Sequence, residues 1–256
     1  MSDFLVSLDG FNDSSVRGGE VEKYRGKRGV TDRLGFIYTR TSLTSFSKEK
    51  LSEIAPRVDS GDMEKATIDG KHYIHQISPV AARVHYNEKF KNLGVFFCQS
   101  KPGHTEVCCE NAGKPSLKIG MLVVHYQTDK SGALQKPFNY VIKPWIFSEA
   151  KYNSLKMKNK EFPLISHDLM VTCTEEDYQK LDFSPCKDAA WRANTDVENQ
   201  ILDEAASMMQ SLQRELGRER SLDELREAFG LSSGAVPADT PSADDLSELL
   251  AQFGNS

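Results

Sequence analysis

Residues 73–98 read YIHQISPVAARVHYNEKFKNLGVFFC. Short runs of β-branched and aromatic residues are separated here by turn-forming residues, which is typical of neighbouring antiparallel strands. Comparable runs follow further along the chain, between turn signals such as Lys101-Pro102-Gly103 and Asn111-Ala112-Gly113. We therefore predict strands at 73–77, 80–86, 94–98, 119–126, 138–142 and 169–172.

Strands this short and this closely spaced favour a small β-barrel. A doubly wound parallel sheet would need a helix between successive strands. The sequence predicts helices only at about 47–55 and 145–157 within this region. The expected fold class is therefore mixed and mainly β.

The C-terminal part of the chain has helical patterning. Thr195 and Glu198 form a capping box, and apolar residues recur at helical spacing after it. Ser221 and Glu224 repeat the box, and Gly230 is a natural helix stop. We predict a helical hairpin over 195–230 that packs on the barrel, with a partner-binding site as the alternative.

Charge is distributed unevenly along the 256 residues. Residues 195–256 carry 13 acidic and 4 basic side chains, which leaves 28 basic and 24 acidic side chains in residues 1–194. A mildly basic body with an acidic tail favours a polyanionic partner. The alternative is ordinary scatter with an acidic helical end.

Three segments follow from these patterns. Residues 1–35, with a basic cluster between Lys23 and Arg33, are expected to form a flexible arm, and 36–230 to form the core. Residues 231–256 are expected to be a linker and an acidic tail. The chain has no apolar run of the ~18 residues that a membrane helix requires, and no basic signal-peptide start, so we expect a cytosolic protein without membrane contact.

A group of His and Cys residues in the loop 85–109 predicts a zinc site. The residues are His85, Cys98, Cys108 and Cys109, with His104 inside the same segment. Zinc prefers sulfur and imidazole ligands in a tetrahedral arrangement. Adjacent cysteines on extended backbone point in opposite directions, so we expect one of them, together with His104, to complete the shell. Buried free thiols with surface histidines are the alternative.

Aromatic and basic residues are interleaved on the predicted strands. Proteins that bind single-stranded DNA use cations for the phosphates and aromatic rings for stacking on bases. The candidate DNA-binding residues are Arg83, Tyr86, Lys89, Phe90, Lys91, Lys118, Tyr126, Lys136, Phe138, Tyr140, Lys143 and Trp145. Since aromatic residues on strands are often buried, about half of these rings are expected in the core.

An enzyme is the weaker interpretation. Cys98, Cys108 or Cys173 could pair with a histidine as a nucleophile and base. However, the sequence has no orienting acid, phosphate loop or paired-carboxylate motif. We therefore expect a non-catalytic protein.

Taken together, these segments resemble the single-stranded DNA-binding (helix-destabilising) protein family of T-even bacteriophages. The spacing His85-x12-Cys98-x9-Cys108 is similar to the family's zinc motif, and 74–79 is similar to the strand and proline before it. The segments 121–124 and 138–146 are similar to its barrel strands, 208–230 to its C-terminal core helices and 244–250 to its acidic terminus. The likeness covers residues 70–250 in order.

Two positions depart from the family pattern. The family's last cysteine lies three residues after its third ligand, where this chain has Asn111, so Cys109 is the nearest substitute. The family's cooperativity motif, a basic patch almost at the N-terminus, is not at the same place here. Self-association along DNA is therefore implied by the family and left open by the sequence.

The resemblance implies an oligonucleotide-binding (OB-type) barrel that carries structural Zn²⁺ and coats transient single strands in phage DNA replication, recombination and repair. It also implies that the acidic tail binds replication and recombination proteins, and that the protein acts in the cytoplasm of the infected bacterial host. The alternative is a metal-stabilised transcription or replication accessory factor, which would bind DNA weakly or with sequence preference.

Overall fold

Strand β7 (Ser116–Tyr126) is the centre of the main sheet, and its residues 119–124 are all buried. One edge of β7 pairs with β8 (Tyr140–Ser148) along nearly its whole length. The other edge is divided, because its first half pairs with β5 (Val80–His85) and its second half with β1 (Thr31–Phe36). A strand with three partners and two covered faces is expected to be apolar where it is covered, as β7 is over residues 119–124.

The computed structural model describes residues 22–98, 104–129, 133–135, 139–175 and 180–231. The main sheet has the order β10-β9-β1-β7-β5-β6, with β8 paired to β7, and the pairs between its named strands are antiparallel. Its remaining strands are β6 (Phe96–Phe97), β9 (Leu169–Cys173) and β10 (Leu181–Pro185).

A smaller sheet contains β2 (Thr39–Ser42), β4 (Lys71–Gln76) and β3 (Met63–Ile68), in that order. Helix α1 (Lys48–Asp59) packs on it through Ile54, next to Met63 and Ile74. The fold is thus mixed α/β with mostly antiparallel sheets, and the strand pairs in the described residues do not close a barrel.

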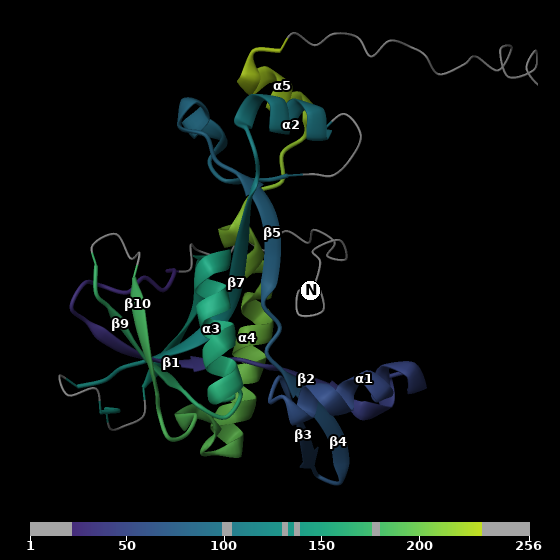
Figure 1. Cartoon of the computed structure of the whole chain (residues 1–256), viewed down its shortest axis with the longest axis vertical. Helices are drawn as coiled ribbons and strands as arrows, with labels where there is room; N and C mark the ends of the chain where they lie inside the picture. The colour runs from purple at the N-terminus through teal and green to yellow at the C-terminus, as the bar shows by residue number, and fades with distance from the viewer. Residues whose placement is uncertain (1–21, 99–103, 130–132, 136–138, 176–179, 232–256) are drawn as a thin grey trace, which may run out of the picture.

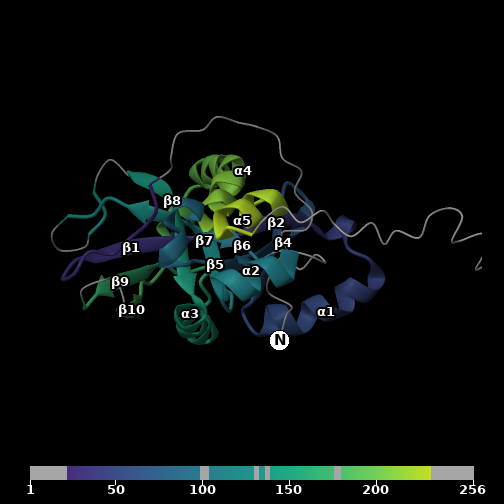
Figure 2. The ribbon, with the colours of Figure 1, turned by 90° about the horizontal axis from the view of Figure 1, so that it is seen from above.

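Two helices cover opposite faces of the main sheet at β7. Helix α3 (Glu149–Glu161) lies on one side and α4 (Thr195–Leu216) on the other, as Figures 1 and 2 show. Gly120 explains how closely α4 approaches: a Cβ atom at this position would lie 2.9 Å from Leu212 and 2.8 Å from Ile146. Only glycine leaves room for the helix there.

The main core lies between this sheet and the helices. It includes Trp145 and Trp191, both fully buried, together with the apolar side chains of β1, β7 and β9. Asp168 is also fully buried, and it accepts hydrogen bonds from Arg33 and Tyr126. This buried carboxylate is therefore satisfied by partners on β1 and β7.

Most of the predicted strands are confirmed, within a few residues. The helices predicted at about 47–55 and 145–157 are confirmed as α1 and α3, but α3 begins later than predicted, at Glu149, because β8 continues to Ser148. The prediction was wrong for part of the arm 1–35: residues 31–35 lie in a central strand, and Tyr24 is buried. Residues 1–21 of that arm lie outside the described residues. A search for apolar runs missed β1 because this strand contains Asp32, Arg33 and Gly35.

The two C-terminal helices exist but do not form a hairpin. Helix α4 packs on the main sheet, whereas α5 (Leu222–Phe229) packs on α2 (His104–Ala112). The capping box of Ser221 and Glu224 is confirmed, and Gly230 ends α5 in the left-handed region. The first box is wrong, because Asn194 caps α4.

Helices α2 and α5 form a second, smaller packing unit at the end of β5 and β6. We call it the Cys/His lobe, and it comprises residues 85–98, 104–112 and 222–229. Figure 1 shows it beyond the main sheet, where β5 and β7 run toward it. Its buried apolar residues are Leu93, Phe96, Cys108 and Leu225. So small a core has little apolar area with which to stabilise itself.

Candidate metal centre and nucleic-acid interface

Two ligand candidates come from a β-hairpin in the Cys/His lobe. His85 is the last residue of β5 and is buried, and its partner in β6 is Phe96, whose ring stacks on it with centroids 5.3 Å apart. Cys98 directly follows β6, and its N–H donates to the carbonyl of Arg83 over 2.8 Å. The hairpin therefore places the imidazole and the thiol side by side.

The other two candidates lie on α2. We expected Cys108 and Cys109 to point in opposite directions because we expected extended backbone, and this was wrong. Successive residues of a helix are only about 100° apart, so both thiols can face the hairpin. The side chain of His104 lies outside the described residues, and the cluster described below forms without it.

The four side chains converge on one point. Their ligand atoms all lie within 4.8 Å of one another. Cys109 Sγ is 3.8 Å from Cys98 Sγ, 3.9 Å from Cys108 Sγ and 3.8 Å from His85 Nε2. Zinc bound tetrahedrally at ~2.3 Å from sulfur requires sulfurs about 3.8 Å apart. The spacing thus fits a tetrahedral ion of this size.

Burial sets the protonation of the group. It raises the pKa of Cys98 and Cys108, and the neighbouring thiols add to the rise that takes the pKa of Cys108 to about 12. Burial also lowers the pKa of His85, while the Gly113 backbone acts in the opposite direction. A neutral imidazole can bind a metal at once, whereas the thiols would release protons on binding.

Asn111, which stands where the resembling family has its last cysteine, has a different contact here. Its side-chain amide donates to the carbonyl of Val107 over 2.7 Å, within α2. It is not in the ligand group, and Cys109 lies within ligand distance of the other three residues instead. Cys109, the residue next to Cys108, would therefore be the fourth ligand of a metal ion bound here.

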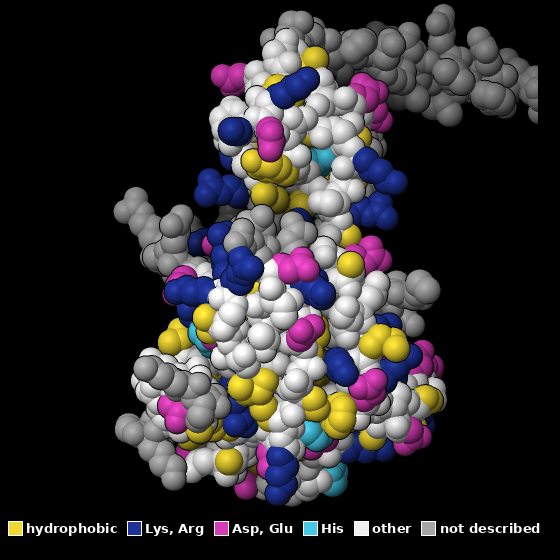
Figure 3. All heavy atoms as spheres, turned by 60° about the vertical axis from the view of Figure 1, so that its left-hand side comes forward, with side chains coloured by type: hydrophobic (Ala, Val, Ile, Leu, Met, Phe, Trp, Pro, Cys, Tyr) yellow, Lys and Arg dark blue, Asp and Glu magenta, His cyan; other side chains and the backbone are white. Residues whose placement is uncertain are grey.

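Four of the predicted DNA-binding residues lie next to this centre. Exposed side chains here are those of Arg83 on β5, of Tyr86 directly after β5, and of Lys89 and Lys91 on the short helix η2 (Glu88–Leu93); Tyr86 is 55% exposed. Arg83 is close enough to Cys98 for its charge to act on the thiol. Figure 3 shows Lys and Arg side chains gathered where the lobe joins the main body.

The remaining predicted DNA-binding residues are less accessible. Tyr126 and Trp145 are 2% and 0% exposed, so both rings are core residues and not stacking surfaces. Tyr140 is half-buried and donates to Glu204, and the ammonium of Lys143 binds Glu22 at 2.8 Å. The rings of Tyr126 and Trp145 belong to the main core, and that is why the pattern misled.

Four candidates remain, and two of them lie in the described residues. Phe90 packs edge-on against Phe229 of α5, with centroids 4.7 Å apart, so it belongs to the lobe's core. Lys118 is half-buried and pairs in register with Ala82 on β5. Lys136 and Phe138 lie outside the described residues.

Lys151 on α3 is a cation that the sequence analysis did not single out. Burial lowers its pKa, Cys173 acts in the opposite direction, and the like charge of Lys118 lowers the pKa further. Its only sequence signal is a basic residue in the first turns of a helix, which is common on ordinary surfaces.

The chain matches no protein-family model, and no curated protein matches it. Within the described residues, no helix is both long and apolar enough to cross a membrane. The candidate function therefore depends on the chemistry of the centre and of its surface.

Proposed function

We propose that this chain is a non-catalytic, sequence-tolerant single-stranded DNA-binding protein whose DNA-binding surface is organised by a structural zinc ion. One observation supports this most: exposed cations and an exposed aromatic ring lie directly beside a cluster with tetrahedral spacing. The cations are Arg83, Lys89 and Lys91, and the ring is Tyr86. Cations bind phosphates and aromatic rings stack on bases, which is the combination that single-strand binders use.

The metal would act on this surface through the backbone. His85 and Cys98 lie at the end of the same hairpin that carries Arg83 and Tyr86. The N–H of Cys98 donates to the carbonyl of Arg83, so a metal ion that holds Cys98 would also hold the backbone of Arg83 in place. His85, Cys98, Cys108 and Cys109 would hold Zn²⁺, which when bound joins the hairpin to α2 and does no reaction chemistry.

We further propose that the strands around β7 belong to an OB-type barrel. Support comes from the division of one edge of β7 between β5 and β1, which bends the sheet around a long shared strand. The T-even phage resemblance agrees with this architecture. On that basis the protein coats transient single strands during phage replication, recombination and repair in the host cytoplasm, and it shifts duplex melting because it binds only the open form.

The acidic tail would have two roles. Residues 232–256 lie outside the described residues, and their sequence carries Asp239, Asp244, Asp245 and Glu248 without a base. Such a segment would compete with DNA for a cationic surface. It would also bind replication and recombination proteins through the apolar residues between 246 and 253.

A double variant tests the surface directly. Replacing Lys89 and Lys91 with Ala should weaken binding to a fluorescein-labelled oligo-dT and flatten its salt dependence, since each lost phosphate contact changes the slope by about 0.7. The matched control replaces Lys48 and Lys50, which are exposed on α1 away from the lobe. Equal losses in both double variants would refute the proposed surface. Preference for one sequence, or for duplex, would instead favour the accessory factor.

A further inference from the structure

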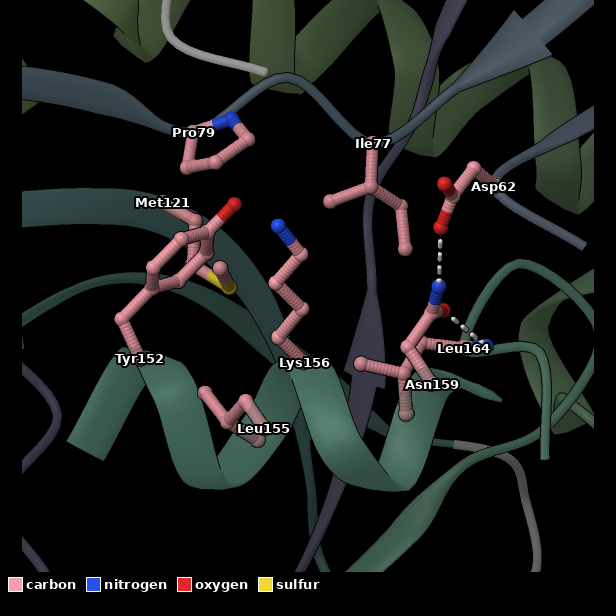
Figure 4. Close-up of a pocket in the computed structure, with 9 residues that line it drawn as sticks. All are labelled: Asp62, Ile77, Pro79, Met121, Tyr152, Leu155, Lys156, Asn159 and Leu164. Carbon is pink, nitrogen blue, oxygen red and sulfur yellow. Dashed lines mark hydrogen bonds between the residues drawn. The ribbon is translucent and has the colours of Figure 1, made fainter. Parts of the chain in front are cut away.

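We propose that a hollow between α3, β7 and residues 77–79, which lead into β5, binds one nucleotide of the DNA strand, separately from the surface at Arg83 and Tyr86. The inference rests on the proposed function and extends its binding path. The hollow has apolar walls, formed by Ile77, Pro79, Met121, Leu155 and Leu164, and is open on one side. Figure 4 shows these side chains around it.

One side of the hollow offers hydrogen-bond donors. Tyr152 and Lys156 lie four residues apart on α3, so they are neighbours on one helix face. Their hydroxyl and ammonium groups point toward Pro79 in Figure 4. Neither polar atom has a hydrogen-bond partner among the described residues. An ammonium and a hydroxyl together suit a phosphate.

The other side offers an acceptor. Asp62 Oδ1 accepts from the amide of Asn159 over 3.0 Å, and Asn159 in turn accepts from the N–H of Leu164 over 2.9 Å. Asn159 is therefore fixed, and it holds the carboxylate at the edge of the hollow. The second oxygen of Asp62 has no partner in the part of the chain that the structure describes. A carboxylate there can accept from the N–H groups of a base, as it does from the cytosine amino group.

The arrangement matches a nucleotide better than a simple anion. A small carboxylic acid or free phosphate would use Lys156 and Tyr152 but would leave the apolar walls uncovered and Asp62 repelling it. A nucleotide would place its phosphate at the donors, its ring at the mouth of the hollow, and its polar edge at Asp62. Charge complementarity thus exists at both ends.

The hollow lies on the same sheet face as the proposed DNA surface. Arg83 is directly opposite Leu117 in the β5–β7 pair, so the two side chains share a face. Leu117 and Met121 are four residues apart on β7 and share that face too, about 13 Å from each other. A strand held at Arg83 would therefore reach the hollow within a few nucleotides.

The test compares two lysines of the same helix. Lys156→Ala should weaken binding of fluorescein-labelled oligo-dC about three- to tenfold at low salt and reduce the magnitude of the salt slope by about 0.7. The control is Lys160→Ala, because Lys160 is exposed on α3 and does not line the hollow. Both lysines are exposed, so the melting temperature of each variant should equal that of the wild type.

A second variant tests recognition of the base. Asp62→Ala should weaken oligo-dC more than oligo-dT, since thymine has no amino group to donate. The inference is overturned if Lys156→Ala and Lys160→Ala behave alike, or if Asp62→Ala affects both oligonucleotides equally, while the wild type still binds single strands. A wild type that binds neither oligonucleotide refutes the proposed function itself, which is a different outcome.

Discussion

Replacing one ligand of the cluster should remove the metal and loosen the Cys/His lobe. We choose Cys98→Ser, because Cys98 is half-buried, follows β6 directly, and its sulfur lies 3.8 Å from that of Cys109. A hydroxyl in its place is a poor ligand for zinc and causes little change in volume. The wild type should carry about one zinc per chain, and the variant much less.

The size of the effect follows from the two cores. The main core contains both tryptophans and the buried residues of the central strands, whereas the lobe buries only Leu93, Phe96, Cys108 and Leu225. A metal present at a thousandfold excess over its Kd stabilises the form that binds it by about 4 kcal/mol. Losing that amount should unfold the lobe while the main sheet remains folded.

Two assays measure this loss. Elemental analysis gives zinc per chain, and limited proteolysis reports whether cleavage appears between residues 85 and 112. The control variant is Cys186→Ser, since Cys186 is also half-buried but lies outside the cluster. A Cys98→Ser protein that retains one zinc per chain and resists protease like the wild type would refute the assignment. Wild-type protein without metal, made with zinc supplied, would refute it as well.

Four other outcomes are expected. Tyr86→Ala should weaken single-strand binding by about 1 to 3 kcal/mol at unchanged melting temperature. Trp145→Ala should instead lower the free energy of unfolding by about 3 to 5 kcal/mol and leave the affinity of the folded fraction unchanged. The reverse pattern in the two variants would contradict the assignment of Tyr86 to the surface and Trp145 to the core. For Glu64, burial raises the pKa, but His75 and Arg192 outweigh burial and lower the pKa to about 2. Its charge therefore stabilises the fold above pH 4.5, and this contribution is lost as the pH falls toward 2. Because the side chain is 37% exposed and partly screened, Glu64→Gln should lower the free energy of unfolding by about 1 kcal/mol at pH 7 and by almost nothing at pH 2. A loss of stability that is the same at both pH values would contradict this. A chain ending at Gly234 should bind oligo-dT more tightly at low salt, with the gain shrinking as salt rises, and equal affinity at every salt would leave the tail without this role.

The strands could be predicted where patterning and burial agree. The run 119–126 is apolar because β7 is covered on both faces, and the turn signals around it mark its ends. Strand β1 could not be predicted, since Thr31, Asp32 and Arg33 look like a solvated segment. Arg33 and Asp32 are tolerated there only because Asp168 and His125 lie across the sheet as partners, and a sequence does not show such long-range pairs.

The candidate site also could be predicted only in part from the sequence. Four ligands could be identified from residue type and spacing, but how both adjacent cysteines reach one point depends on α2 being helical. The aromatic candidates could not be sorted from sequence, because Tyr86 and Tyr126 have the same local pattern. Helix packing decides between them, and Tyr126 ends up beneath Asp168 and Trp191. The hollow beside α3 gave no sequence signal, since its walls come from four separate segments.

The most direct test of the central claim is titration of single-stranded and duplex DNA of equal length across a range of salt. The label belongs on the DNA and is followed by fluorescence anisotropy, because Trp145 and Trp191 are both fully buried and report poorly on a bound strand. We expect strong preference for the single strand, similar affinity for different sequences, and a slope of log K against log salt between about −2 and −3, from three or four phosphate contacts. Equal affinity for duplex, or a slope near zero, would contradict the account.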